Sequence, residues 1–136
     1  GSYIKTIEKL GVSSQVFFPN KFFSDSELNI ISQKCHVGVA LYNTDETNPT
    51  YYTDPGKVKA YAELGLPIIM SDVSAIAPFI KKFKSGIVID KTSDALLKAL
   101  VNIKNNYQEY ILGLNKFNKY FYYEDYYRKA FNFLEK

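Results

Sequence analysis

Short apolar runs separated by helical stripes are the feature of this sequence that most constrains its fold. Val37–Tyr42 is apolar and does not alternate with polar residues, which is typical of a strand covered on both faces of a parallel sheet. Ile68–Met70 and Gly86–Ile89 are shorter runs of the same kind, with amphipathic helical patterns between them. Strands that alternate with helices predict an α/β fold built on a parallel, Rossmann-like sheet.

A fourth strand is predicted at Gln15–Phe18, where an apolar run ends at Pro19. The clearest helix start is at Ser24, which forms a capping box pattern with Glu27. The spacing of apolar residues also predicts helices at 3–10, 55–64, 76–83, 96–101, 111–121 and 127–134. We therefore expect about four strands flanked by helices, in a single domain over residues 1–136.

Charge and residue usage limit the classes of function. The chain has 136 residues, 17 of them basic and 14 acidic, and a net charge of +3, which is too small and dispersed for a nucleic-acid footprint. Cys35 and His36 are its single cysteine and histidine, so we expect no internal disulfide and no four-ligand metal site. The apolar runs fall short of the roughly 20 residues of a membrane span. A reducing, cytoplasmic setting without a transmembrane segment is expected.

The segment from Tyr51 to Ile69 carries the candidate chemistry, because it joins a polar loop, a helix start and a buried strand. Open α/β sheets bind ligands at the carboxyl ends of their strands. The first amides of a helix lack intrahelical partners and the helix dipole is positive there, so this helix start could hold a phosphate or diphosphate. The candidate residues are Thr53, Asp54, Pro55, Gly56 and Lys57. A purely structural helix start with a solvated lysine is the alternative at this point.

Residues 54–61, Asp-Pro-Gly-Lys-Val-Lys-Ala-Tyr, and residues 65–69, Gly-Leu-Pro-Ile-Ile, resemble a signature of GT-B glycosyltransferases of the group 1, GT4-like type. That signature is Pro-x-Lys-hydrophobic-x-Glu-Tyr-x-x-x-Gly-x-Pro. Four further segments resemble flanking elements of the family and occur in the same order: Gln15–Phe18, Ser26–Leu28, Cys35–Val39 and Lys84–Val88. The resemblance implies a partial C-terminal, nucleotide-sugar-binding domain that lacks its N-terminal acceptor domain.

The resemblance also implies roles for particular residues. The helix start would contact the diphosphate of a nucleotide sugar, and Phe18, Pro19 and Asn20 would lie near the nucleobase; a core position for Phe18 is the alternative. The paired acidic motif of the family is absent, because Ala60 and Tyr52 stand where its two acidic residues lie. No catalytic residue is assigned, because a general base would belong to the other domain. No metal and no cofactor besides the donor substrate is implied.

These implications predict the donor-binding domain of a hexosyltransferase, inactive by itself, which presents a nucleotide-diphosphate sugar to an acceptor hydroxyl. One alternative is a non-catalytic α/β interaction module whose aromatic C-terminal helices bind a partner. Another is a sugar-nucleotide epimerase of the same architecture. Polysaccharide biosynthesis, with a location peripheral to the inner membrane face, is the expected setting of such an enzyme.

The resemblance raises a problem for the sheet. A complete domain of this family has the strand order 3-2-1-4-5-6, and this chain resembles only strands three to six. The strand expected at Gln15–Phe18 would then be separated from Val37–Tyr42 by two vacant positions. An unsatisfied buried backbone group costs about 1–3 kcal/mol, and an open sheet edge invites another chain. We expect either that the strand shifts to pair with Val37–Tyr42 or that a second copy fills the gap in a homodimer.

Overall fold

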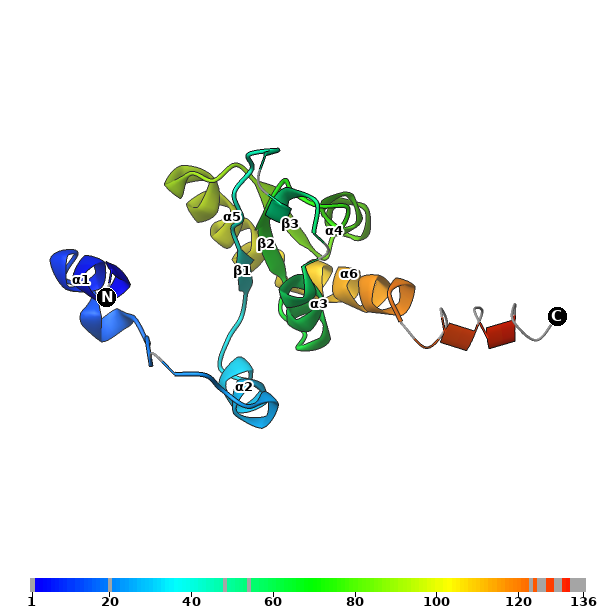
Figure 1. Ribbon diagram of the computed structural model, residues 1–136, viewed down its shortest axis with the longest axis horizontal. Coiled ribbons are helices and arrows are strands. Elements are labelled where there is room, and N and C mark those ends of the chain that lie inside the picture. The colour runs from blue at the N-terminus through cyan, green and yellow to red at the C-terminus, as the bar shows by residue number, and fades with distance from the viewer. Residues whose placement is uncertain are drawn as a thin grey trace.

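The computed structural model describes residues 2–19, 21–47, 49–53, 55–122, 124, 127–128 and 131–132, and its elements alternate between helix and strand (Figure 1). Over these residues the α-helices and strands are α1 (Ser2–Lys9), α2 (Asp25–Ser32), β1 (Gly38–Ala40), α3 (Gly56–Glu63), β2 (Ile68–Ser71), α4 (Ala77–Phe83), β3 (Gly86–Ile89), α5 (Ser93–Asn105) and α6 (Tyr107–Tyr120). Two short 3-10 helices are η1 (Ser13–Gln15) and η2 (Pro49–Tyr51).

The three strands form a parallel sheet in the order β1-β2-β3. Ile68 in the central strand is in register with Gly38 of β1 and with Gly86 of β3. All four residues of β2 are buried, as expected of a strand with neighbours on both sides and helices on both faces. The predicted α/β fold with a parallel sheet is therefore confirmed.

The side chains of β2 alternate between two apolar layers. Ile68 and Met70 belong to a core cluster with residues of α3, α4 and α6, whereas Ile69 belongs to a second cluster with residues of α5. The sheet is thus covered by three helices on one face and by one helix on the other (Figure 1). The helices predicted at 55–64, 76–83, 96–101 and 111–121 correspond to α3, α4, α5 and α6. Half of the residues of the helix predicted at 127–134 lie outside the described residues, and the described half, 127–128 and 131–132, is helical.

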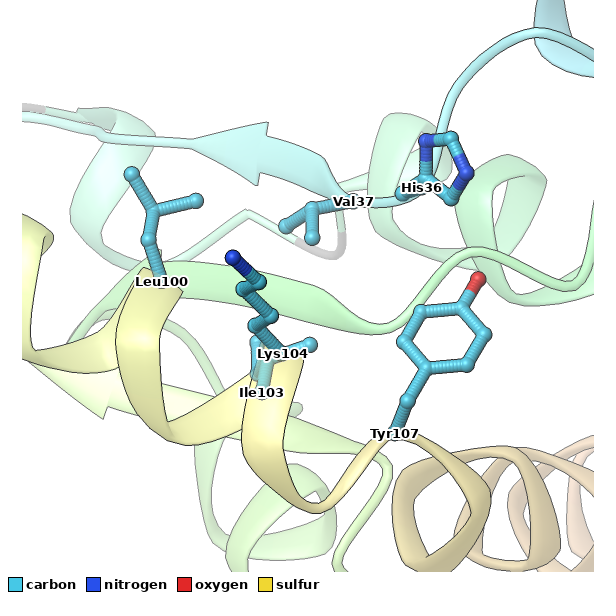
Figure 2. Close-up of a pocket in the computed structure, with 6 residues that line it drawn as sticks. All are labelled: His36, Val37, Leu100, Ile103, Lys104 and Tyr107. Atoms are coloured by element: carbon cyan, nitrogen blue, oxygen red, sulfur yellow. The ribbon is translucent and has the colours of Figure 1, made fainter.

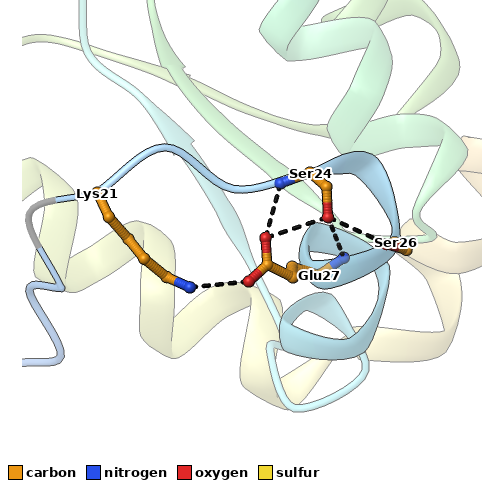
Figure 3. Close-up of polar contacts among 4 residues, drawn as sticks. All are labelled: Lys21, Ser24, Ser26 and Glu27. Carbon is orange, nitrogen blue, oxygen red and sulfur yellow. Dashed lines mark hydrogen bonds and ion pairs between the residues drawn. The ribbon is translucent and has the colours of Figure 1, made fainter.

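The capping box predicted at the start of α2 is also confirmed (Figure 3). The Glu27 amide donates to Ser24 Oγ at 3.3 Å, and the Ser24 amide donates to the Glu27 carboxylate at 2.8 Å. Lys21 Nζ lies 2.8 Å from the same carboxylate. The contact with Lys21, followed by the hydrogen bonds from Ser24, lowers the pKa of Glu27. The side chains around this helix start therefore fix it locally, without help from the sheet.

The prediction of a strand at Gln15–Phe18 is wrong. Gln15 is the last residue of η1, and residues 16–19 pair with no strand among the described residues. Phe17 is 75% exposed. The expected shift of this segment onto β1 does not occur, because β1 pairs with β2 alone in the described sheet. An apolar run needs a backbone partner to become a strand, and Figure 1 shows α1, the following segment and α2 standing away from the sheet.

Candidate functional site

A buried side chain fixes the point where the polar loop leaves the sheet. Ser71, at the end of β2, is fully buried. Its Oγ accepts a hydrogen bond from the Tyr42 amide at 2.7 Å and donates to the Tyr42 carbonyl at 3.0 Å. The backbone ladder of β1 ends at Ala40, so the serine side chain extends the pairing of the two strands by a further step. The start of the loop is thereby held at the carboxyl edge of the sheet.

Two loops meet at this edge. The amide of Ser74, in the loop after β2, donates to the carbonyl of Tyr51 in η2 at 2.8 Å. Ser74 has φ = 65°, a left-handed conformation that is strained for a residue other than glycine. Earlier in the first loop, Asp45 accepts hydrogen bonds from the amide and hydroxyl of Thr47, and these bonds lower the pKa of Asp45. Both loops are therefore tied down by hydrogen bonds.

The start of α3 leaves its first turn accessible. Pro55 is the N-cap residue, and its side chain offers no acceptor to the amides of the first turn. The Val58 amide donates to the Pro55 carbonyl at 2.9 Å, which leaves the amides of Gly56 and Lys57 as the donors an anion could reach. A Cβ added at Gly56 would meet no atom within 4 Å. Space for a ligand therefore lies directly beside the backbone of the first turn.

Lys57 brings a positive charge to this helix start. The residue is exposed, and its Nζ lies 5.9 Å from the centroid of the Tyr42 ring, the outer range of a cation–π contact. Burial raises the pKa of Tyr42, so its ring stays neutral through the physiological range. Because Ser71 holds the Tyr42 backbone, the lysine lies against an anchored aromatic ring at the carboxyl end of β1.

Close packing sets the position of α3 against β1. A Cβ at Gly38 would collide with the Tyr61 ring, and the Tyr61 hydroxyl lies 3.5 Å from the carbonyl oxygen of Val39. Burial, with a smaller contribution from Tyr42, raises the pKa of Tyr61. The Tyr61 ring therefore packs directly against the strand, and the missing side chain of Gly38 leaves room for it. This contact fixes the height of the helix start above the sheet.

The structure brings together only part of the residue set predicted from sequence. Pro55, Gly56 and Lys57 form the start of α3, and Thr53 lies two residues before Pro55, whereas Asp54 lies outside the described residues. The candidates for the nucleobase lie in the segment between η1 and α2, which Figure 1 shows apart from α3: Phe18 and Pro19 are there, and Asn20 lies outside the described residues. The Phe18 ring instead contacts Tyr3 of α1, with a centroid distance of 6.2 Å.

A cavity of about 270 Å³ lies between η2 and the loop after β2, at the carboxyl edge of the sheet, and was missed by sequence reasoning. Tyr51 and Tyr52 line it from η2, and residues 72–75 and Pro78 line it from the loop after β2 and from α4. The Asp72 carboxylate accepts a hydrogen bond from Lys81 at 2.8 Å. The only signal in the sequence was the position of residues 72–75 directly after a buried strand, at the edge where such sheets bind ligands.

A larger cavity, of about 470 Å³, lies at the opposite end of β1, between that strand and α5 (Figure 2). Figure 2 shows Val37 facing Leu100 and Lys104 across it, with the Tyr107 hydroxyl directed toward His36. The His36 and Tyr107 rings meet edge to face at 6.3 Å. The lining is mostly apolar, and its place at the amino end of the strand separates it from the start of α3.

In the described part of the chain, no group of three or more histidine, cysteine, aspartate or glutamate residues is placed to hold a metal ion. None of the described helices has the length and apolar character needed to span a bilayer.

A family model described as glucosyltransferase 3-like, C-terminal domain, matches residues 12–133. This range includes all three strands, the start of α3 and both loops at the carboxyl edge of the sheet. Neither a curated protein nor a solved structure matches the chain.

Proposed function

Because the chain belongs to the glucosyltransferase 3-like C-terminal domain family, we propose that it is a donor-binding domain that holds a nucleotide-diphosphate sugar at the start of α3. The family supports the glycosyltransferase class. The main support for this binding site is the helix start itself. Its backbone is accessible, the space beside Gly56 is open, and Lys57 adds a positive charge at the carboxyl edge of a parallel sheet. The GT-B arrangement with a separate acceptor domain is part of the proposal.

The proposed chemistry at this site is electrostatic. In glycosyl transfer, the acceptor oxygen forms a bond to the anomeric carbon, and the bond from that carbon to the phosphate oxygen breaks. Negative charge then grows on the departing nucleoside diphosphate. The amides of Gly56 and Lys57, the dipole of α3 and the Lys57 ammonium are oriented before the reaction to stabilise that charge. The acceptor, and the group that takes up its proton, are assigned to another domain.

A non-catalytic interaction module is the second candidate, and the exposed apolar residues favour it. Phe22 is fully exposed and Phe17 is 75% exposed, both in the segment that stands away from the sheet. The aromatic residues at the end of α6 support it less, because they contact one another. Phe121, for instance, lies 4.6 Å from Phe117 and 5.1 Å from Tyr120 in centroid distance.

A thermal-shift screen with UDP, GDP and their glucose esters tests the proposal. A ligand that binds only the folded chain stabilises it by about 2.7 kcal/mol at a hundredfold excess over Kd. The donor-binding proposal predicts that one nucleotide and its glucose ester raise the melting temperature, while adenosine and inorganic phosphate at the same concentration do not. An equal, negligible response to all of these ligands would favour the interaction module. An epimerase would bind nucleotide sugars but transfer no sugar to an acceptor.

A further inference from the structure

The cavity of about 470 Å³ at the amino end of β1 has the size of a ligand site. Cavities that bind small molecules span about 300–1,000 Å³ and are mostly apolar, with a few polar groups that orient the ligand. Here Val37 lies on one side, and Leu100 and Ile103 of α5 lie on the other (Figure 2). Ile103 is fully buried, whereas Leu100 is 38% exposed. This apolar lining suits an aliphatic group.

The cavity lies where the covering of the sheet by α5 is incomplete. Ala99 and Ile103 are the fully buried residues of α5 in the core cluster on this face, and Ile69 of the central strand belongs to the same cluster. Val39 of β1, the outer strand, is still 41% exposed. The β1 side of α5 therefore has apolar surface that a small ligand can cover.

Two polar side chains at the cavity lack partners among the described residues. The Lys104 ammonium makes no ion pair with them, whereas Lys98 of the same helix pairs with Asp94 at 2.7 Å. The Tyr107 hydroxyl makes no hydrogen bond with them, and its ring meets His36 edge to face. Figure 2 shows the Lys104 ammonium on the side of α5 that faces the strand. Because none of the described lining residues is acidic, an anionic group complements this lining.

The corner between α5 and α6 holds the tyrosine wall of the cavity in place. Asn106 Nδ2 donates to the Asn102 carbonyl at 3.0 Å. The Tyr110 hydroxyl donates to Asn102 Oδ1 at 2.9 Å. Tyr107 lies between these two bonded residues and directly follows Asn106. The wall is therefore positioned before a ligand binds, which lowers the entropic cost of binding.

From these observations we infer that the cavity binds a carboxylate with an aliphatic body, with the carboxylate against the Lys104 ammonium and the chain against Val37 and Ile103. The ammonium contact is a charge-assisted hydrogen bond, and the chain gains free energy as its methylenes leave water. Neither the sequence signature nor the family match assigns a ligand to this cavity. It lies at the opposite end of β1 from the start of α3, so the inference does not depend on the donor-binding function.

Titrations of the full chain with octanoate, hexanoate and 1-hexanol, followed by the amide resonances of Val37 and Lys104 in ¹H–¹⁵N spectra, test both parts of this inference. Octanoate should bind about tenfold more tightly than hexanoate, because it buries two more methylenes. Hexanoate should bind at least about tenfold more tightly than 1-hexanol, which has no charge. Equal affinities for hexanoate and the alcohol would overturn the carboxylate assignment, and no response to octanoate would overturn the whole inference.

Two substitutions locate the ligand. Lys104→Met keeps a long side chain without its charge and should weaken octanoate binding at least about tenfold. Lys98→Met, on the same helix but outside the lining, should keep the parental affinity. Leu100→Trp should obstruct the cavity and weaken binding to a similar extent, whereas Val101→Trp, at a more exposed position of α5, should not.

The exposed position of Lys104 makes its variant safe for the fold, so Lys104→Met alone carries the test if the tryptophan variants unfold. Parental octanoate affinity in Lys104→Met, or in a folded Leu100→Trp, would overturn the site. An equal loss in Lys104→Met and Lys98→Met would overturn it as well, because it would indicate attraction to the overall charge of the chain.

Discussion

Lys57 is the side chain through which the proposed diphosphate site acquires a formal charge. We expect Lys57→Ala to weaken binding of the nucleotide by roughly tenfold, about 1.4 kcal/mol, because one charge-assisted contact to phosphate is lost. Calorimetric titration measures this loss. The free energy of unfolding should change by no more than about 0.5 kcal/mol, since the side chain is exposed and its cation–π contact with Tyr42 lies at the outer distance limit.

The matched control for this substitution is Lys98→Ala. Lys98 is also an exposed helical lysine, but it lies on α5 and pairs with Asp94 at 2.7 Å. Its loss should leave nucleotide affinity unchanged. Equal affinities for the parent, Lys57→Ala and Lys98→Ala would remove Lys57 from the site.

Among the contacts between elements, the Ser71 hydroxyl extends the pairing of β1 with β2 beyond the backbone ladder. Ser71→Ala should lower the free energy of unfolding by about 1–3 kcal/mol, because the half-buried amide and carbonyl of Tyr42 lose their partner. Urea denaturation of the parent and the variant measures the difference. Ser13→Ala, which removes an exposed serine of η1, should have little effect. A Ser71→Ala variant as stable as the parent would show that the serine does not hold the loop.

The three strands of the sheet were predictable because each is an apolar run without alternation. Burial on both faces explains this pattern in β2, whereas Val39 of β1 is 41% exposed, so the expected covering of that strand on both faces is not found. The start of α2 was predictable because its cap is made by neighbouring residues. Gln15–Phe18 is also an apolar run, but a strand needs a neighbouring strand to pair with its backbone. The local sequence pattern contains no information on whether such a neighbour exists.

The site was predictable to a similar extent. The start of α3 could be located because a local signature marks it. Ser71 and Asp72 could not, since their roles depend on the register of β2 against β1 and on the contact between two loops. The bond from Ser74 to Tyr51 joins residues 23 positions apart, and no periodicity encodes it.

The described part of the chain exposes aromatic side chains before β1 and an open sheet edge at β1. In the segment before β1, Phe17 and Phe22 are largely exposed, and the outer edge of β1 pairs with no other described strand. Of the two outcomes expected for this edge, only association with a second copy remains a prediction. Light scattering should therefore give the mass of a dimer at micromolar concentrations, and Phe17→Ser with Phe22→Ser should shift the chain toward monomer. A monomer at every concentration would contradict this.

If the first turn of α3 binds the diphosphate, a β-branched side chain at position 56 should obstruct it, and Gly56→Val examines this. A Cβ at this position enters open space in the structure, so the valine should leave the packing of the fold unchanged. Ala60→Val, at an exposed position of the same helix, controls for the reduced helix propensity of valine, about 0.5 kcal/mol. Calorimetric titration with whichever of UDP and GDP stabilises the parent more should show at least about tenfold weaker binding to Gly56→Val and parental affinity for Ala60→Val. Equal affinity in all three proteins would contradict the account.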